Sequence, residues 1–220
     1  MPARLFLLAT AVGSAWITRE SVPYFFGGRI HPFLLEKLES GVLASEATWI
    51  TALHVHVVSA LFALPACLAL TLRSVQRRFP RVHRWLGRVT AFAVLFTLVP
   101  SGGYLALSAK GGVPSTVGFL VSGAITAFAM IQAVRTARAR DFTAHRRYSA
   151  HVLAQLSVAI TSRALLVVFD RAAIDPELAY LVALWVPVVG SALVAELFTS
   201  PNRRTRHAPR VHLLARDPAH

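Results

Sequence analysis

Two histidines occupy matching places in the sequence, each followed by arginine and each just ahead of an apolar segment. His83 lies in "FPRVHRWLGRV" and His145 lies in "DFTAHRRYSAHV". Two neutral imidazoles on facing helices can ligate a haem iron from both sides, and arginines at the membrane edge can pair with the haem propionates. This pattern makes the two histidines candidate ligands of haem b. The candidate propionate partners are Arg84, Arg88 and Arg146.

Other polar side chains lie inside the apolar segments, where an unpaired polar group is costly. On a helix with about 100° per residue, the segment that begins at His83 carries its hydroxyl groups on one face. That face consists of His83, Thr90, Thr97, Ser101, Tyr104 and Ser108. A second group of candidate polar-site residues is His54, Tyr104, His151, Gln155 and Arg163. Because His54, Tyr104 and Arg163 fall near the far ends of their segments, we expect an inner histidine layer and an outer polar layer.

Six apolar segments carry these side chains: residues 4–18, 49–72, 88–109, 115–137, 147–169 and 177–199. About 20 apolar residues in a helix cross a hydrocarbon core of about 30 Å. Only 15% of the residues are charged, whereas about 25% is usual for a soluble domain. The sequence therefore predicts an all-α, polytopic membrane helical bundle with about six transmembrane helices. The first segment is short and contains "AVGSA", so a retained helix and a cleaved signal peptide both remain open.

Positive charge gathers on one side of these segments. The connections at 73–88 and 135–147 and the tail after Pro201 are rich in arginine, whereas the opposite connections hold most of the acidic residues. The positive-inside rule then places both arginine-rich connections and both termini in the cytoplasm. The same distribution accounts for the net charge of +13 without a nucleic-acid partner. We expect the bundle over residues 1–200 and a disordered basic cytoplasmic tail over residues 201–220.

Smaller patterns add local expectations. The stretch "HPFLLEKLES" predicts a short amphipathic helix on the membrane surface. Gly118, Ser122 and Thr126 repeat every four residues, which is typical of a close-packing face. We expect a kink at Pro100. Glu196, near the end of the last segment, is expected to reach the cytoplasmic headgroups.

Several of these residues form a pattern shared with a known family. "LHV" at residues 53–55 is followed by "RRFPRVHRWLGRV", by a Gly-Gly pair, by "RARDFTAHRRY" and by "AITSR". Over about residues 50–165 the chain resembles the bacterial predicted-membrane-protein family called domain of unknown function 2306 (DUF2306). The resemblance implies a multi-pass architecture and a bacterial cytoplasmic (inner) membrane location, but no activity. Its pattern falls on His54, His83, Arg84, Gly87, Arg88, His145, Arg146 and Arg163.

Three functions remain open from the sequence. The first is a membrane-complex assembly factor or lipid-associated protein, acting as a homo-oligomer or with another membrane protein, whose arginine-rich loops bind anionic headgroups of the bilayer. The second is a redox membrane protein with one b-type haem between His83 and His145. The third is a small proton-coupled transporter, since ionisable residues inside a bilayer mark ion paths. A zinc site is disfavoured because the sequence has no compact group of His, Cys and carboxylate ligands.

Overall fold

The computed structural model describes residues 2–21, 32–41 and 43–199. This part of the chain consists of helices joined by turns and contains no strand, which confirms the predicted all-α class. The helices are α1 (Pro2–Ser21), α3 (Pro32–Glu39), α4 (Glu46–Thr71), α5 (Arg73–Arg78), α6 (Pro80–Phe92), the π-helix η1 (Ala93–Leu98), α7 (Val99–Ala106), α8 (Gly112–Arg138), α9 (Phe142–Arg171) and α10 (Pro176–Thr199). The tail predicted over residues 201–220 lies outside the described residues.

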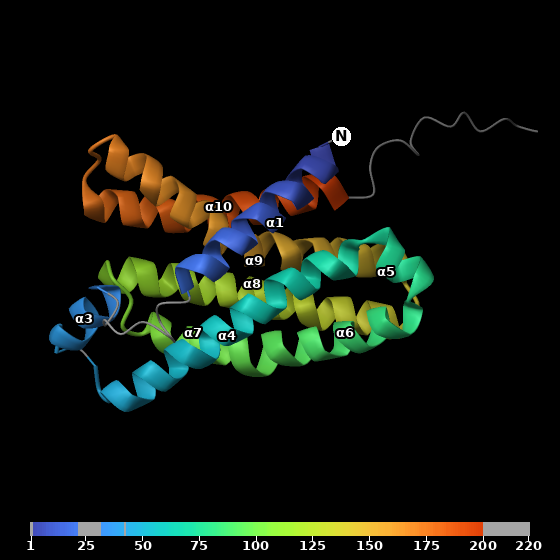
Figure 1. The fold of residues 1–220 in the computed structure, drawn as a ribbon, viewed down its shortest axis with the longest axis horizontal. Coiled ribbons are helices and arrows are strands. Elements are labelled where there is room, and N and C mark those ends of the chain that lie inside the picture. The colour runs from blue at the N-terminus through green and yellow to red at the C-terminus, as the bar shows by residue number, and fades with distance from the viewer. Residues whose placement is uncertain (1, 22–31, 42, 200–220) are drawn as a thin grey trace, which may run out of the picture.

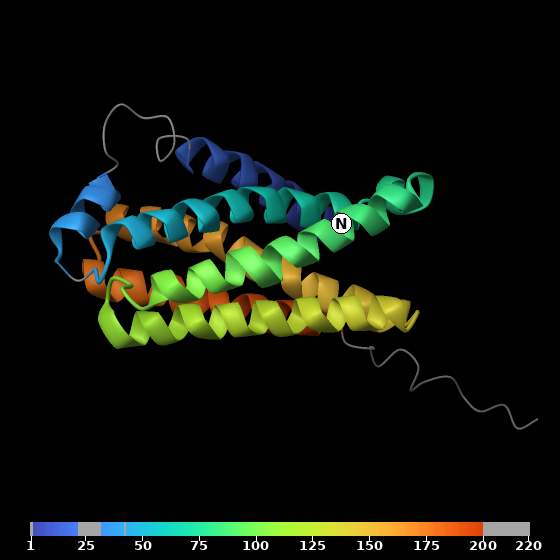
Figure 2. The same cartoon turned by 90° about the horizontal axis from the view of Figure 1, so that it is seen from below.

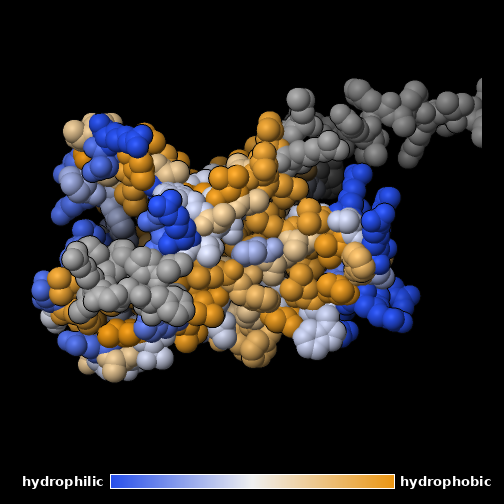
Figure 3. All heavy atoms as spheres, viewed as in Figure 1, coloured by the Kyte–Doolittle hydropathy of each residue, from blue (hydrophilic) through white to orange (hydrophobic). Residues whose placement is uncertain are grey.

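Five helical segments among the described residues are long and apolar enough to cross a membrane. They are α4, the continuous run α6–η1–α7, α8, α9 and α10. In Figure 3, apolar side chains cover the middle of the molecule and hydrophilic ones gather at its two ends. This distribution and the five spans confirm a multi-pass membrane architecture. Helix α1, which covers the first predicted segment, is not among the five, but it packs against α4 and α9.

The third span begins earlier than the sequence predicted. Helix α6 starts at Pro80, with only Phe79 between it and the end of α5, rather than near residue 88. A proline is well placed in the first turn of a helix, where its missing N–H would have no intrahelical partner. His83 therefore lies within the helix, and the predicted hydroxyl face from His83 to Tyr104 lies on one continuous helical run, whereas Ser108 lies in the turn after α7.

The irregularity predicted at Pro100 takes the form of a π-helix. Segment η1 ends at Leu98, two residues before the proline. Proline removes a backbone donor and its ring crowds the preceding turn, and a π-helical turn is one of the ways in which a helix accommodates such a disruption. The adjustment falls where α7 faces α4, close to several hydroxyl groups described below.

Side-chain caps fix the starts of three spans. Ser45 accepts a hydrogen bond from the Thr48 N–H at the start of α4, and Asp141 accepts one from the Ala144 N–H at 3.0 Å at the start of α9. Asp175 accepts from the Leu178 N–H at 2.9 Å, just before α10. An oxygen acceptor at this place satisfies backbone donors that a helix leaves unpaired. These short polar residues thus set where the long apolar helices begin.

The arginine-rich connections lie at the same end of the bundle. Figure 1 shows the α5–α6 turn and the α8–α9 turn at one end, and α3 with the α9–α10 turn at the other. In the view of Figure 2, α6 and α8 separate toward the end that carries the two arginine-rich turns. His83 and His145 belong to the first turns of α6 and α9 at this end.

Helix α3 confirms the short helix predicted in "HPFLLEKLES". Lys37 donates a hydrogen bond to the backbone carbonyl of Ser108, and Glu36 pairs with Lys110 at 2.9 Å. Both contacts attach α3 to the turn between α7 and α8. The helix thus covers the end of the bundle that lies opposite the two arginine-rich turns.

The main core lies between α4, η1, α8 and α9. Its buried side chains include Ala63, Val94, Met130 and Val152. A second, smaller apolar cluster joins α9 to α10 through Val158, Leu184 and Val188. Glycine allows the close packing predicted for the small-residue face of α8. A Cβ atom on Gly118 would lie 2.7 Å from Cδ2 of Leu184, so glycine allows this approach of α8 to α10 without a shift of Leu184.

Candidate functional site

His145 is held in one ring orientation by the backbone of α8. Its Nδ1 lies 2.9 Å from the carbonyl oxygen of Ala133. A carbonyl can only accept, so Nδ1 carries the hydrogen and the neutral ring keeps its lone pair on Nε2. Histidines that ligate metals are usually oriented in this way, with the second nitrogen donating to a carbonyl or a carboxylate.

His83 is the second imidazole at this end of the bundle. Its Nδ1 is buried and has no hydrogen-bond partner among the described residues. His83 lies in the first turn of α6, at the same end of the bundle as His145 (Figure 1) and one residue before Arg84. A buried polar atom without a partner is uncommon and needs an explanation. The structure places the two members of the predicted inner histidine layer at the same end of the bundle (Figure 1).

The predicted arginine partners lie at the surface, on the same two helices as the histidines. Arg84, Arg88 and Arg146 are all exposed. Arg84 and Arg88 come from α6, and Arg146 directly follows His145 on α9. Exposed guanidinium groups at a membrane edge are suited to anionic groups such as carboxylates and phosphates. The site thus combines two imidazoles with cations on both helices.

The donor set suits haem better than a bare metal ion. The described residues contain no group of three or more His, Cys, Asp and Glu side chains that could hold a metal. A structural or catalytic zinc ion needs three or four protein ligands. Haem supplies four nitrogen ligands itself and needs only axial ones from the protein. Two histidines are therefore enough in number for axial ligation of haem, but not for a zinc site.

Comparison with protein families identifies the family. A model described as predicted membrane protein (DUF2306) matches residues 53–199. The chain belongs to this family. The matched range contains every candidate site residue named above and extends past the resemblance seen in the sequence, through α10. Comparisons with curated proteins and with solved structures returned no match.

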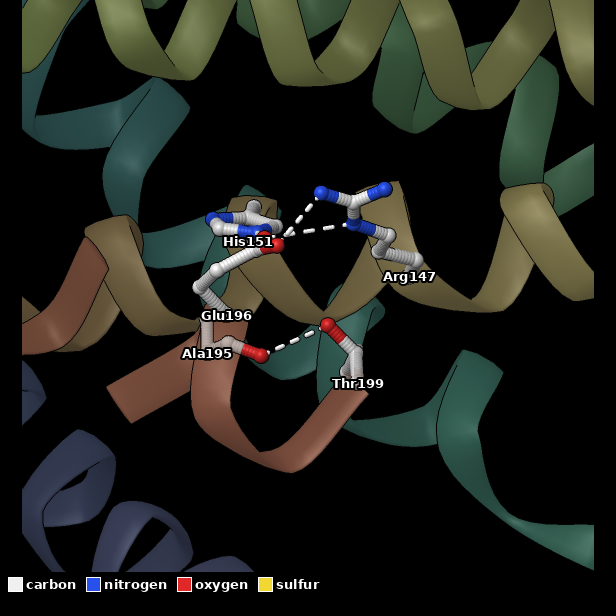
Figure 4. A network of polar contacts seen from close by, with 5 residues as sticks. All are labelled: Arg147, His151, Ala195, Glu196 and Thr199. Carbon is white, nitrogen blue, oxygen red and sulfur yellow. Dashed lines mark hydrogen bonds and ion pairs between the residues drawn. The ribbon is translucent and has the colours of Figure 1, made fainter. Parts of the chain in front are cut away.

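This DUF2306 chain also contains a charged network that the sequence did not predict. Arg147 binds Glu196 through two nitrogens, Nε at 3.2 Å and Nη2 at 2.5 Å, and His151 Nε2 lies 3.1 Å from the same carboxylate. Figure 4 shows Arg147 and His151 reaching from α9 to Glu196 on α10. The expectation that Glu196 serves only the headgroups is therefore wrong. The spacing of Arg147 and His151, four residues apart, was the available signal.

One turn deeper, Gln155 continues the same face of α9. Only 4% of this residue is exposed. Its Nε2 donates to the Val188 carbonyl at 3.1 Å and to Ser191 Oγ at 3.0 Å, and its Oε1 accepts from Ser122 Oγ at 3.1 Å. The predicted polar face of α9 is thus an interhelical contact that ties together α8, α9 and α10. This use is structural, since each polar atom of the amide has a partner.

We expect Gln155→Ala to lower the free energy of unfolding by about 2 kcal/mol, from three interhelical hydrogen bonds at about 0.6 kcal/mol each. Unfolding in mixed micelles measures the change. Gln132→Ala on α8 is the matched control, because the same amide is removed from a half-buried position. Equal losses for the two variants would contradict this account of the α8–α10 contact.

The outer polar side chains include one that the sequence analysis did not select. His56, which the sequence analysis did not select, has its Nδ1 3.1 Å from the Leu98 carbonyl at the end of η1. A Cβ atom on Gly102 would lie 2.8 Å from its ring, so α7 packs directly on this imidazole. Arg163 is exposed and donates to the Ala159 carbonyl of its own helix at 3.1 Å.

Tyr104 and the hydroxyl face of the third span line a groove between α4 and the η1–α7 run. The groove has a volume of about 520 Å³ and opens to the surface. Thr97 Oγ1 lies 2.7 Å from Ser59 Oγ of α4, and Trp49 Nε1 donates to Ser108 Oγ at 2.9 Å. The hydroxyl face predicted from the sequence therefore packs on α4. His54 lies half-buried on the same helix.

Proposed function

We propose that this DUF2306 protein is a six-helix protein of the bacterial inner membrane that binds one b-type haem between His83 and His145 and acts as a one-electron redox protein. Both termini are cytoplasmic in this proposal, and α1 is the sixth helix. The position of α1 against α4 and α9 supports its place in the bundle. The shared end of the two arginine-rich turns (Figure 1) supports the orientation.

The observation that carries the haem proposal is the state of the two imidazoles. His145 is oriented by the Ala133 carbonyl with its Nε2 lone pair available, and His83 lies in the first turn of α6 at the same end of the bundle (Figure 1), with an Nδ1 that has no partner among the described residues. Within an apolar bundle, a pair of neutral imidazoles is suited to axial ligation of haem iron. Bound haem supplies one-electron chemistry at this end of the bundle.

The residues of the chain contribute orientation and charge. The Ala133 carbonyl fixes the ring of His145, which lowers the entropy cost of ligation. Arg88 and Arg146 are available for the two propionates from opposite helices, because both are exposed at the same end as the histidines. Apolar neighbours such as Val82 and Leu86 on α6 offer surface for the porphyrin ring.

The contacts that the structure gives among the described residues do not specifically favour a proton-coupled transporter. The charged group most suited to that role, Glu196, already binds Arg147 in a two-point ion pair and also contacts His151. A carboxylate held in this way joins two helices. The network therefore supports a fixed α9–α10 pair at the cytoplasmic end.

The proposal is tested by the visible spectrum of the protein purified from haem-replete cells. We expect a Soret band that shifts on reduction, and iron at one equivalent per chain by metal analysis. An oxidised sample should show the low-spin ferric signal that two imidazole ligands produce. A protein that has no such band, and that takes up no haem in a titration with haemin, would show that the proposal is wrong.

A further inference from the structure

A hollow lined by arginines lies at the junction of α5 and α6. Its volume is about 480 Å³ and its lining residues are Arg78, Phe79, Pro80, Arg81, Val82 and Arg84. The junction belongs to the end of the bundle that carries both arginine-rich turns (Figure 1). A membrane protein presents this level of its surface to lipid headgroups.

The lining of the hollow carries positive charge and no negative charge. Arg78, Arg81 and Arg84 are exposed, and its lining contains no acidic residue. The ion pairs within the described part of the chain are formed elsewhere, at Lys110–Glu36 and around Glu196. Three guanidinium groups around one hollow attract an anion that accepts several hydrogen bonds, and phosphate has that geometry.

The apolar part of the lining distinguishes a lipid from a free anion. Phe79 is 57% exposed and Val82 is 53% exposed, and the neighbouring Trp85 is 68% exposed. Large apolar side chains next to arginines on a short helix at a membrane edge are typical of an interfacial segment. Such a surface accepts a ligand with a phosphate at one end and hydrocarbon at the other.

We propose that this hollow binds an anionic phospholipid, with the phosphodiester on Arg78, Arg81 and Arg84 and the glycerol and first acyl carbons on Phe79 and Val82. Lipid binding would anchor α5 and the start of α6, and so the helix turn that carries His83. Arg84 and Val82 are named in both proposals, whereas Arg78 and Arg81 are not among the candidate propionate partners, so variants of Arg78 and Arg81 test the lipid site separately from haem.

Lipid titrations of the purified protein in a non-ionic detergent test the inference. The probes are phosphatidylglycerol, phosphatidylcholine and inorganic phosphate, and binding is read by native mass spectrometry or by the thermal shift. We expect Arg78→Gln with Arg81→Gln to weaken phosphatidylglycerol binding roughly 25-fold, since each arginine near anionic lipid contributes about a fivefold factor. The matched control is Arg135→Gln with Arg138→Gln, which removes the same charge from exposed positions in the last turns of α8.

The outcomes separate the alternatives. The lipid site is supported if the Arg78→Gln, Arg81→Gln protein binds phosphatidylglycerol more weakly while the Arg135→Gln, Arg138→Gln control changes little. The wild type should also bind phosphatidylcholine and inorganic phosphate only weakly. Equal losses in both variants would mean that only net charge matters and would overturn it. Inorganic phosphate that binds as tightly as phosphatidylglycerol would overturn the lipid assignment in favour of a plain anion site. The Soret band is expected to be the same in both variants, so failure here does not bear on haem.

Discussion

Protein carrying His145→Ala is expected to be purified without the reduction-sensitive Soret band of the wild type, even from haem-replete cells. Alanine removes the ring that the Ala133 carbonyl holds at 2.9 Å, and with it the nitrogen proposed to ligate the haem iron. The iron would then keep His83 as its only protein ligand at this site. We expect haem per chain, measured from the absorbance and iron content, to fall to background. His83→Ala, on α6, should likewise reduce the haem per chain to background.

The control variant is His151→Ala, on the same helix as His145. It removes an imidazole that contacts Glu196 at 3.1 Å, and Arg147 still binds the carboxylate. We expect this protein to keep the band at full intensity and to elute as the wild type does in size-exclusion chromatography. A His145→Ala protein that retains both the band and the low-spin ferric signal would contradict axial ligation by this pair.

Much of the fold follows from composition alone. Runs of about 20 apolar residues have few stable alternatives to a helix in a bilayer, because every backbone polar group must be paired within the segment. Five predicted spans are therefore helices close to the expected places. The early start of α6 was harder to predict, since arginines were counted as loop residues. Pro80 in the first turn was the signal that a helix starts there.

The features of the candidate site that depend on a single helix could be predicted from the sequence. The depth of His83 and His145 follows from their distance to the apolar runs, and the face of Gln155 follows from helical periodicity. Partners on other helices depend on how the helices rotate against one another. The Glu196–Arg147 pair and the His56–Leu98 contact are of this kind, and periodicity within one segment does not fix them.

Gly118 of α8 is expected to contribute to the stability of the protein because it allows two helices to pack closely. Gly118 is buried where α8 meets α10, and a Cβ atom there would lie 2.7 Å from Leu184 Cδ2 and 3.3 Å from Trp185 Cε2. Leu184 is itself only 4% exposed and belongs to the apolar cluster with Val158 and Val188. A larger residue at 118 therefore requires Leu184 and Trp185 to shift or α8 and α10 to move apart.

We expect Gly118→Leu to lower the free energy of unfolding by about 3 kcal/mol through overpacking at this contact. Gly190→Leu is the control, because a Cβ atom at Gly190 of α10 meets no atom within 4 Å. That variant should be neutral or slightly stabilising, since glycine inside a helix costs about 1 kcal/mol relative to alanine. Unfolding in mixed micelles measures both. Equal stability of the two variants would mean that α8 and α10 are not in close contact at Gly118, and that the α8–α10 packing described above is wrong.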